Sequence, residues 1–240
     1  MLGDIYNAIL YKPLFNLLVY FYNIIPGHDI ALAIILLTVF IKLILWPFFA
    51  QSIKAQKSMQ NIQPKIEELK LKYGDDKQKM GPAMMELYKK EKVNPLSSCL
   101  PLLLQLPILI AVYQVFRIGL ANGGAVNPDF LYSFTTNPGA LNPIAFSIID
   151  FAKGSWPMAI LAGAAQFWQT KMMMKKTAEQ KNSPAMPSSA ETITKQMTYL
   201  MPIMTIVIGG SLPAGLTFYW LIMTLFGVLQ QWIVLRKDTK

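Results

Sequence analysis

The 240-residue sequence has few of the side chains that catalysis and metal binding use. It contains one cysteine and one histidine, and only 15% of its residues are charged. A single cysteine excludes an intrachain disulfide, and the scattered acids form no metal-ligand cluster with Cys99 or His28. Soluble domains carry about 25% charged residues, so this composition indicates a membrane protein rather than one soluble core.

Acidic residues are missing from every long apolar segment of the chain. This absence argues against an acid-coupled proton pump and against an intramembrane aspartyl protease. The sequence also lacks a glycine-rich phosphate loop that ends in Lys-Ser/Thr. We therefore predict a protein that is not an enzyme and that needs no cofactor or metal. No basic region precedes an apolar run at the N-terminus, which argues against a secretory signal.

Five apolar segments are present, and we predict that each is a transmembrane helix of an all-α polytopic membrane protein. The most apolar is Ile30 to Phe49, IALAIILLTVFIKLILWPFF, which would reach about 30 Å as a helix, the hydrocarbon thickness of a bilayer. The fourth is short, since its twelve apolar residues would cover about 18 Å. The predicted spans are residues 30–50, 96–116, 156–174, 197–208 and 213–235.

Two further segments are predicted to lie at the membrane surface. Residues 1–29 are apolar but interrupted by tyrosines and asparagines, which is typical of an amphipathic interfacial helix. The alternative for this segment is a sixth span. Residues 117–155 contain Asn-Pro and Gly-Gly turn signals and are predicted to be an extracytoplasmic loop, with a short interfacial helix at 143–151.

Residues 51–94 are polar and are predicted to form a helical hairpin in water. Apolar residues from Ala55 to Tyr73 recur at spacings of four and three, as on one face of a helix, and Met80, Met84 and Leu87 continue this spacing in a second helix. Gly74-Asp75-Asp76 would turn the chain, with Asp75 or Asp76 as the N-cap. Pro64 should kink or break the first helix.

Lysine and arginine are distributed unevenly along the chain. Residues 51–94 hold ten of the 22, residues 171–196 hold five and the tail 236–240 holds three. The positive-inside rule places these segments in the cytoplasm. Five spans then put the N-terminus outside, the loop 117–155 outside and the loop 175–196 in the cytoplasm.

Lys42 lies seven residues before the end of the first span, well inside the hydrocarbon thickness. A charge at that depth costs roughly 2.5–3.5 kcal/mol on insertion scales, and it usually faces protein or a wet cavity. We predict a hydrated cavity, and the alternative is that Lys42 reaches the nearer interface on its long side chain. The polar residues of the spans would either line this cavity or form interhelical hydrogen bonds worth about 0.6 kcal/mol each. They are Thr38, Gln105, Gln114, Gln166, Gln169, Thr217, Gln230 and Gln231.

Three segments resemble the YidC family of membrane protein insertases, which includes the mitochondrial oxidase-assembly and chloroplast Albino proteins. They are QPKIEELKLKYGDDKQKM, MMELYKKEKVNPLSSCLPLLLQLPI and GLTFYWLIMTLFGVLQQWIVLR. The resemblance covers nearly the whole chain and implies the minimal five-span form. It also implies a groove that is open to the cytoplasm and to lipid, with a positive residue on the first span. Lys42 takes that position, where most bacterial members have arginine, and Gln166 and Trp220 fall where relatives have groove-lining residues.

The resemblance implies an insertase and chaperone that acts on newly made membrane proteins in the bacterial plasma membrane and works as a monomer. Further candidate partners are the ribosome, which the basic tail would contact by charge, and the Sec translocon. A small-solute channel or transporter would use the same polar residues as a through-pore. An assembly scaffold without insertion activity is a third alternative.

Overall fold

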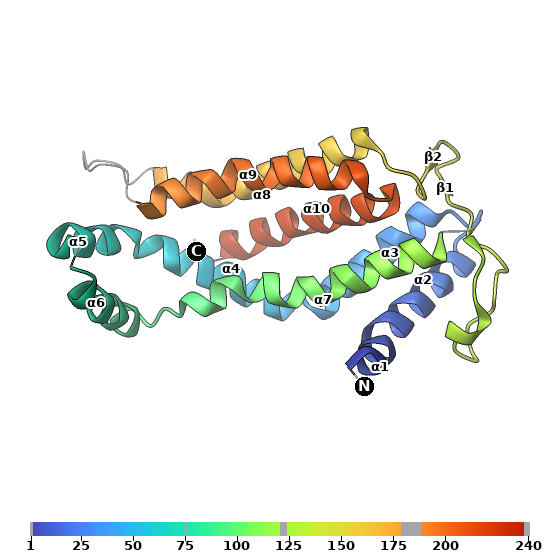
Figure 1. Cartoon of the computed structure of the whole chain (residues 1–240), viewed down its shortest axis with the longest axis horizontal. Coiled ribbons are helices and arrows are strands. Elements are labelled where there is room, and N and C mark those ends of the chain that lie inside the picture. The colour runs from blue at the N-terminus through green and yellow to red at the C-terminus, as the bar shows by residue number, and fades with distance from the viewer. Residues whose placement is uncertain (1, 75, 121–123, 179–188, 238–240) are drawn as a thin grey trace.

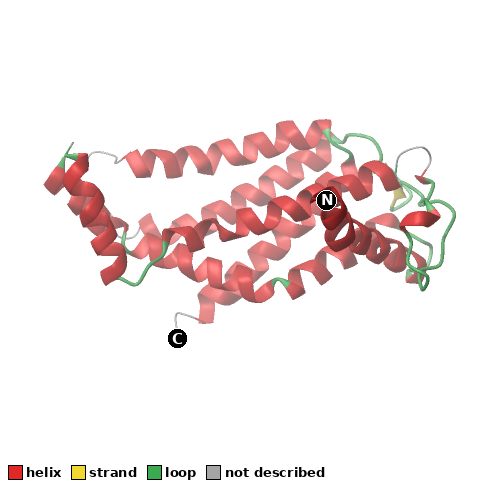
Figure 2. Cartoon of the chain, turned by 60° about the horizontal axis from the view of Figure 1, so that its bottom comes forward, coloured by secondary structure: helices red, strands yellow, loops and turns green. Residues whose placement is uncertain are grey.

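The computed structural model describes residues 2–74, 76–120, 124–178 and 189–237, and most of them are helical (Figure 1). Two views show the helical hairpin α5–α6 at one end of a helix bundle and the short strands β1 and β2 at the other (Figure 2). The elements are α1 (Leu2–Tyr6), η1 (Asn7–Tyr11), α2 (Lys12–Ile24), α3 (Ile30–Ile44), α4 (Trp46–Asn61), α5 (Gln63–Tyr73), α6 (Lys77–Lys90), α7 (Pro95–Gly119), η3 (Pro128–Phe130), β1 (Ile144–Ala145), β2 (Ile149–Asp150), α8 (Trp156–Ala178), α9 (Ser189–Ser211) and α10 (Ala214–Lys237).

The N-terminal segment is helical from α1 through the π-helical turn η1 to α2. One side of α2 is buried and packs on α3 and α7, with Phe15, Leu18 and Val19 inside the hydrophobic core. Residues 2–24 are therefore helical, and α2 packs into the helix bundle instead of lying only on its surface. Its position relative to a membrane stays a prediction.

The helix over residues 30–50, the predicted first span, is not continuous, because it breaks at Leu45. The axes of α3 and α4 differ by 67° at this break. Pro47 supplies the physical reason: it has no N–H to donate to the carbonyl of Leu43, and its ring crowds that carbonyl. The amide of Leu45 instead donates to Ile41 and Leu43, so α3 ends there and α4 continues in a new direction to Asn61.

Residues 51–94, the predicted hairpin, contain the end of α4 and the two helices α5 and α6, whereas the spacing of apolar residues indicated two helices. The seam of these apolar residues runs through the end of α4 and then α5, with a break at Ile62, two residues before Pro64. Asp76 is the N-cap of α6, and its carboxylate accepts the amide of Lys79. Asp75 lies outside the described residues. A salt bridge of 2.6 Å from Lys65 to Glu91 joins the two ends of the hairpin.

The remaining four predicted spans correspond to the long helices α7, α8, α9 and α10. The helices α7, α8 and α10 cover nearly the predicted ranges, whereas α9 begins at Ser189, inside the predicted loop 175–196. Gly163 lets α8 and α9 pack closely, because a Cβ at this position would collide with Ile206. Residues 179–188 and 238–240 lie outside the described residues.

Helix length and hydropathy identify fewer membrane spans than the five predicted. Among the described residues, Ala214–Arg236 is long and apolar enough alone, and Ile30–Ile44 with Trp46–Asn61 qualifies only as a bent pair. Leu103–Gly119 and Thr198–Ser211 are shorter apolar helices. The count of five spans therefore stays a prediction.

The loop before α8 forms a small β-hairpin, so the short helix predicted at 143–151 is wrong. Ile144 pairs with Asp150, and Ala145 pairs with Ile149. Phe146 and Ser147 have positive φ at the turn, and the amide of Phe146 donates to Asp29 at 2.6 Å. The turn is held by this contact with a residue more than a hundred positions earlier. A local sequence pattern does not contain such a contact, so the sequence did not predict the hairpin.

Asp29 connects the start of α3 to this hairpin. One carboxylate oxygen accepts the amides of Ala31 and Leu32 as an N-cap, and the other accepts the amide of Phe146. We expect Asp29→Ala to lower the free energy of unfolding by about 1–2 kcal/mol, because it removes both functions. Asp29→Asn should keep the cap but place an amide donor against Phe146.

Hydrogen exchange in detergent micelles separates the two functions of Asp29. The amide of Phe146 should exchange faster in both variants, whereas the amides at the start of α3 should exchange faster only in Asp29→Ala. Unchanged exchange at Phe146 in both variants would contradict the role of this contact.

Candidate functional site

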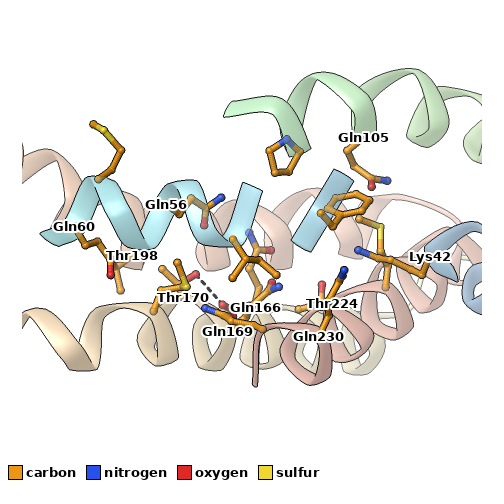
Figure 3. A pocket seen from close by; sticks show the side chains of 18 of the residues that line it. Lys42, Gln56, Gln60, Gln105, Gln166, Gln169, Thr170, Thr198, Thr224 and Gln230 are labelled. Carbon is orange, nitrogen blue, oxygen red and sulfur yellow. Dashed lines mark hydrogen bonds between the residues drawn. The ribbon is translucent and has the colours of Figure 1, made fainter. Parts of the chain in front are cut away.

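A pocket of about 700 Å³ lies where α4 bends away from α3 and faces α7, α8 and α10 (Figure 3). Its wall combines one lysine with glutamines, threonines and methionines. The residues that line it are Lys42, Phe49, Ile53, Gln56, Met59, Gln60, Gln63, Pro101, Gln105, Gln166, Gln169, Thr170, Met173, Thr198, Trp220, Met223, Thr224, Gly227, Gln230 and Gln231.

Lys42 lies in the last turn of α3 and is only 5% exposed. The bend after Leu45 brings Phe49 beside it, so that the ammonium lies 4.0 Å from the centre of the Phe49 ring. A cation over an aromatic face is stabilised by about 0.5–2 kcal/mol, more when the pair is desolvated. Lys42 forms no salt bridge within the described part of the chain. Its positive charge therefore remains available to a bound anionic group.

Two glutamines of the wall are held by side chains of neighbouring helices. Gln105 of α7 donates to the hydroxyl of Tyr219 at 3.3 Å, and Gln166 of α8 accepts a hydrogen bond from Thr205 of α9. These bonds fix the two amides relative to neighbouring helices.

Gln169 lies against α10 at Gly227. A Cβ at position 227 would collide with the Gln169 amide, so a glycine there allows the amide to approach the α10 backbone.

The bend between α3 and α4 is held from α10. Gln230 is 1% exposed and donates to the carbonyl of Trp46, the first residue of α4, at 3.0 Å. The rings of Trp46 and Phe226 meet edge to face with their centres 6.0 Å apart. Gln231, the next residue, is 2% exposed, and its Nε2 atom has no hydrogen-bond partner among the described residues.

The pocket contains five of the seven residues predicted for the site, and their contact with a substrate stays a prediction. These five are Lys42, Gln105, Gln166, Gln169 and Trp220. Thr38 and Thr217 are buried outside the lining: Thr38 donates to the carbonyl of Ile34, and Thr217 donates to the carbonyl of Gly209. Thr38 is thus satisfied within its own helix and Thr217 by a carbonyl of the preceding helix α9, so neither contributes a free polar group to the wall. Gln114 also lies outside the lining.

Sequence reasoning missed the part of the wall that comes from the polar segment after Phe49. Gln56, Gln60 and Gln63 recur at spacings of four and three, which places them together on one side of α4 and the start of α5. That spacing was the available signal. It was missed because the apolar seam in the same segment assigned these residues to a water-exposed hairpin.

The pocket has the electrostatic character of a site for polar or anionic chain segments. It contains one lysine, and no aspartate or glutamate is among the described residues that line it. Glutamine side chains supply both donors and acceptors, and three methionines supply adaptable apolar surface. No group of three or more metal-ligating residues is found among the described residues.

These features define a class of protein: a helix bundle with a polar, positively charged pocket between its helices. The family described as 60Kd inner membrane protein matches residues 20–240, and the chain belongs to this family. A relative named membrane protein insertase YidC from Fusobacterium nucleatum is 35% identical and aligned over 87% of each chain. A second protein of that name from Rickettsia bellii is 32% identical over 96% of this chain and 39% of its own length.

A solved structure described as an active YidC insertase with its first transmembrane domain resolved has the same fold. Its TM-score is 0.60 at 24% identity, and the match covers 91% of this chain and 45% of that one. The chain thus spans most of the Fusobacterium relative but less than half of the Rickettsia relative and of the solved structure.

We expect Gln230→Leu to loosen the bend between α3 and α4, because the substitution removes the donor to Trp46. Spin labels on the exposed positions Leu36 of α3 and Lys54 of α4 would report the angle as a distance distribution. The distribution should broaden in Gln230→Leu and stay narrow in Gln114→Leu, a matched change on α7 outside the pocket. An identical distribution in wild type and Gln230→Leu would show that the bend does not depend on this bond.

Proposed function

We propose that this chain is a membrane protein insertase and chaperone for small membrane proteins. The observation that carries the proposal is the buried ammonium of Lys42 in a polar pocket with no acidic residue in its described lining. Family membership and the names of the relatives support the same function. The proposed clients are newly made membrane proteins with a polar tail or loop that must cross the bilayer.

The mechanism lowers the cost of moving a polar segment into the membrane. The pocket offers hydrogen-bond partners at a depth where lipid offers none, which reduces the desolvation cost of the client's polar groups. Lys42 attracts an acidic side chain of the client, and charges interact more strongly in such surroundings than in water. The apolar part of the client then leaves along α7 and α10 into lipid. These steps need no cofactor.

The proposed topology follows the distribution of basic residues. The α5–α6 hairpin and the C-terminus face the cytoplasm, and the N-terminus and the β1–β2 hairpin face the outside of a bacterial plasma membrane. The proposal has five spans, with α3 and the start of α4 as one bent span. The apolar part of α9, Thr198–Ser211, covers about 21 Å and would thin the bilayer locally. The ribosome and the Sec translocon are proposed partners of a monomer.

We expect the charge of Lys42 to matter for clients with acidic tails. In proteoliposomes, Lys42→Met and Lys42→Glu should lower insertion of such a client by about ten-fold or more, which corresponds to roughly 1.4 kcal/mol. Lys42→Arg should retain most of the activity because it keeps the charge. A client whose acidic residues are replaced by asparagine should depend much less on position 42. Equal insertion of the acidic client by all variants would refute the charge role.

Labelling of position 42 tests the one-sided pocket against a pore. Cys99→Ser combined with Lys42→Cys leaves a single thiol, which a membrane-impermeant maleimide can reach only through water. We expect labelling from the cytoplasmic side alone. Labelling from both sides would indicate a solute channel instead, and absence of labelling from either side would remove the hydrated pocket from the mechanism.

A further inference from the structure

Gln231 is a pocket residue with a buried amide nitrogen that donates to no acceptor among the described residues. It lines the pocket, is 2% exposed, and its Nε2 atom has no partner. A buried N–H group without a partner is costly, and of the five buried polar side-chain atoms without a partner among the described residues, that of Gln231 is the one whose residue lines the pocket. By contrast, Gln105, Gln166 and Gln230 each make a hydrogen bond to another helix.

Gln230, the residue before Gln231 on α10, shows one kind of acceptor that a glutamine amide binds at this part of the fold. Gln230 donates to a backbone carbonyl, that of Trp46 at the break between α3 and α4. A client segment that enters the membrane before it has formed a complete helix carries unpaired carbonyls of the same kind. The Gln231 amide group is a neutral donor, so it matches a carbonyl, whereas the charge of Lys42 matches a carboxylate.

We propose that Gln231 donates a hydrogen bond to a main-chain carbonyl of the client segment, so that the pocket recognises unpaired backbone independently of side-chain charge. This inference rests on the proposed insertase function and adds a second recognition element to it. Lys42 selects clients that carry acidic residues, and Gln231 binds a main-chain carbonyl, which every polypeptide has. The methionines Met59, Met173 and Met223 in the same wall suit this role, because flexible thioethers pack against segments of varied shape.

Gln231→Met tests the proposal, since it keeps the size of the side chain and removes the donor. Insertion in proteoliposomes is measured for two clients that differ only in aspartate or asparagine at the tail. We expect the loss of one hydrogen bond to lower insertion of both clients by the same factor, about three- to ten-fold. Lys42→Met should instead lower the acidic client far more than the neutral one. Gln114→Met, half-buried on α7 outside the pocket, is the matched control and should change neither.

Backbone recognition is then tested directly with chemically synthesised clients. Each carries one ester in place of an amide at successive positions of the polar flank, which weakens the carbonyl there as an acceptor. At one or two positions the ester should lower insertion by wild type but have no effect on Gln231→Met, so the two changes are non-additive. Additive effects at every position would overturn the proposal. The proposal would also be overturned if Gln231→Met lowered insertion of the acidic client more than that of the neutral client. It would be overturned as well if the lower insertion came with a lower unfolding temperature and did not depend on the ester.

The wild-type reactions separate this inference from the proposed function. If wild type inserts neither client, the insertase function fails and the backbone contact fails with it. If wild type inserts both clients and Gln231→Met inserts them equally well, the insertase function stands and only the role of Gln231 is refuted.

Discussion

The burial of one ammonium group governs the arrangement of the helices around it. Lys42 stands in an apolar helix, where its charge would be unfavourable against lipid. The break at Leu45 turns α4 so that Phe49 faces the ammonium at 4.0 Å, and α7, α8 and α10 add polar side chains around the same space. A straight first helix would carry Phe49 onward along its axis, away from Lys42, and the enclosed space would not form.

The bend depends on a proline within the bent segment and on contacts from α10, which is distant in sequence. Pro47 weakens the helix locally, but a proline alone does not fix a direction. Gln230 and Phe226 of α10 hold Trp46 through a hydrogen bond and a ring contact. The last helix, α10, therefore holds the start of α4 in position, and both helices contribute to the pocket wall. Substitutions on α10 should act on the pocket even where their side chains do not reach it.

The two ends of the bundle differ in how their polar groups are satisfied. At the β1–β2 end, Asn16 bonds the backbone of Phe130 and Tyr132, and the hydroxyl of Tyr22 accepts the amide of Asn142. These internal bonds hold an irregular loop firmly on α2. At the pocket end, the amide nitrogen of Gln231 has no hydrogen-bond partner among the described residues, and flexible methionines form part of the wall. The polar groups named at the first end thus bond within the fold, although the buried hydroxyl of Thr135 in the same loop has no partner among the described residues, and at the pocket end the Gln231 amide nitrogen remains for a partner.

The sequence alone predicted the long helices, the turn after Tyr73 and a lysine inside an apolar helix. Apolar runs, Pro64, the cap at Asp76 and a lysine in an apolar helix are local signals, because each depends on neighbours within a few positions. Tertiary structure decided which polar residues share the pocket: Gln56 and Gln60 entered it, whereas Thr38 and Thr217 turned to nearby carbonyls. It also decided the β-hairpin that Asp29 holds. A hydrogen bond across the fold exists only once distant segments pack, so sequence periodicity carries no record of it.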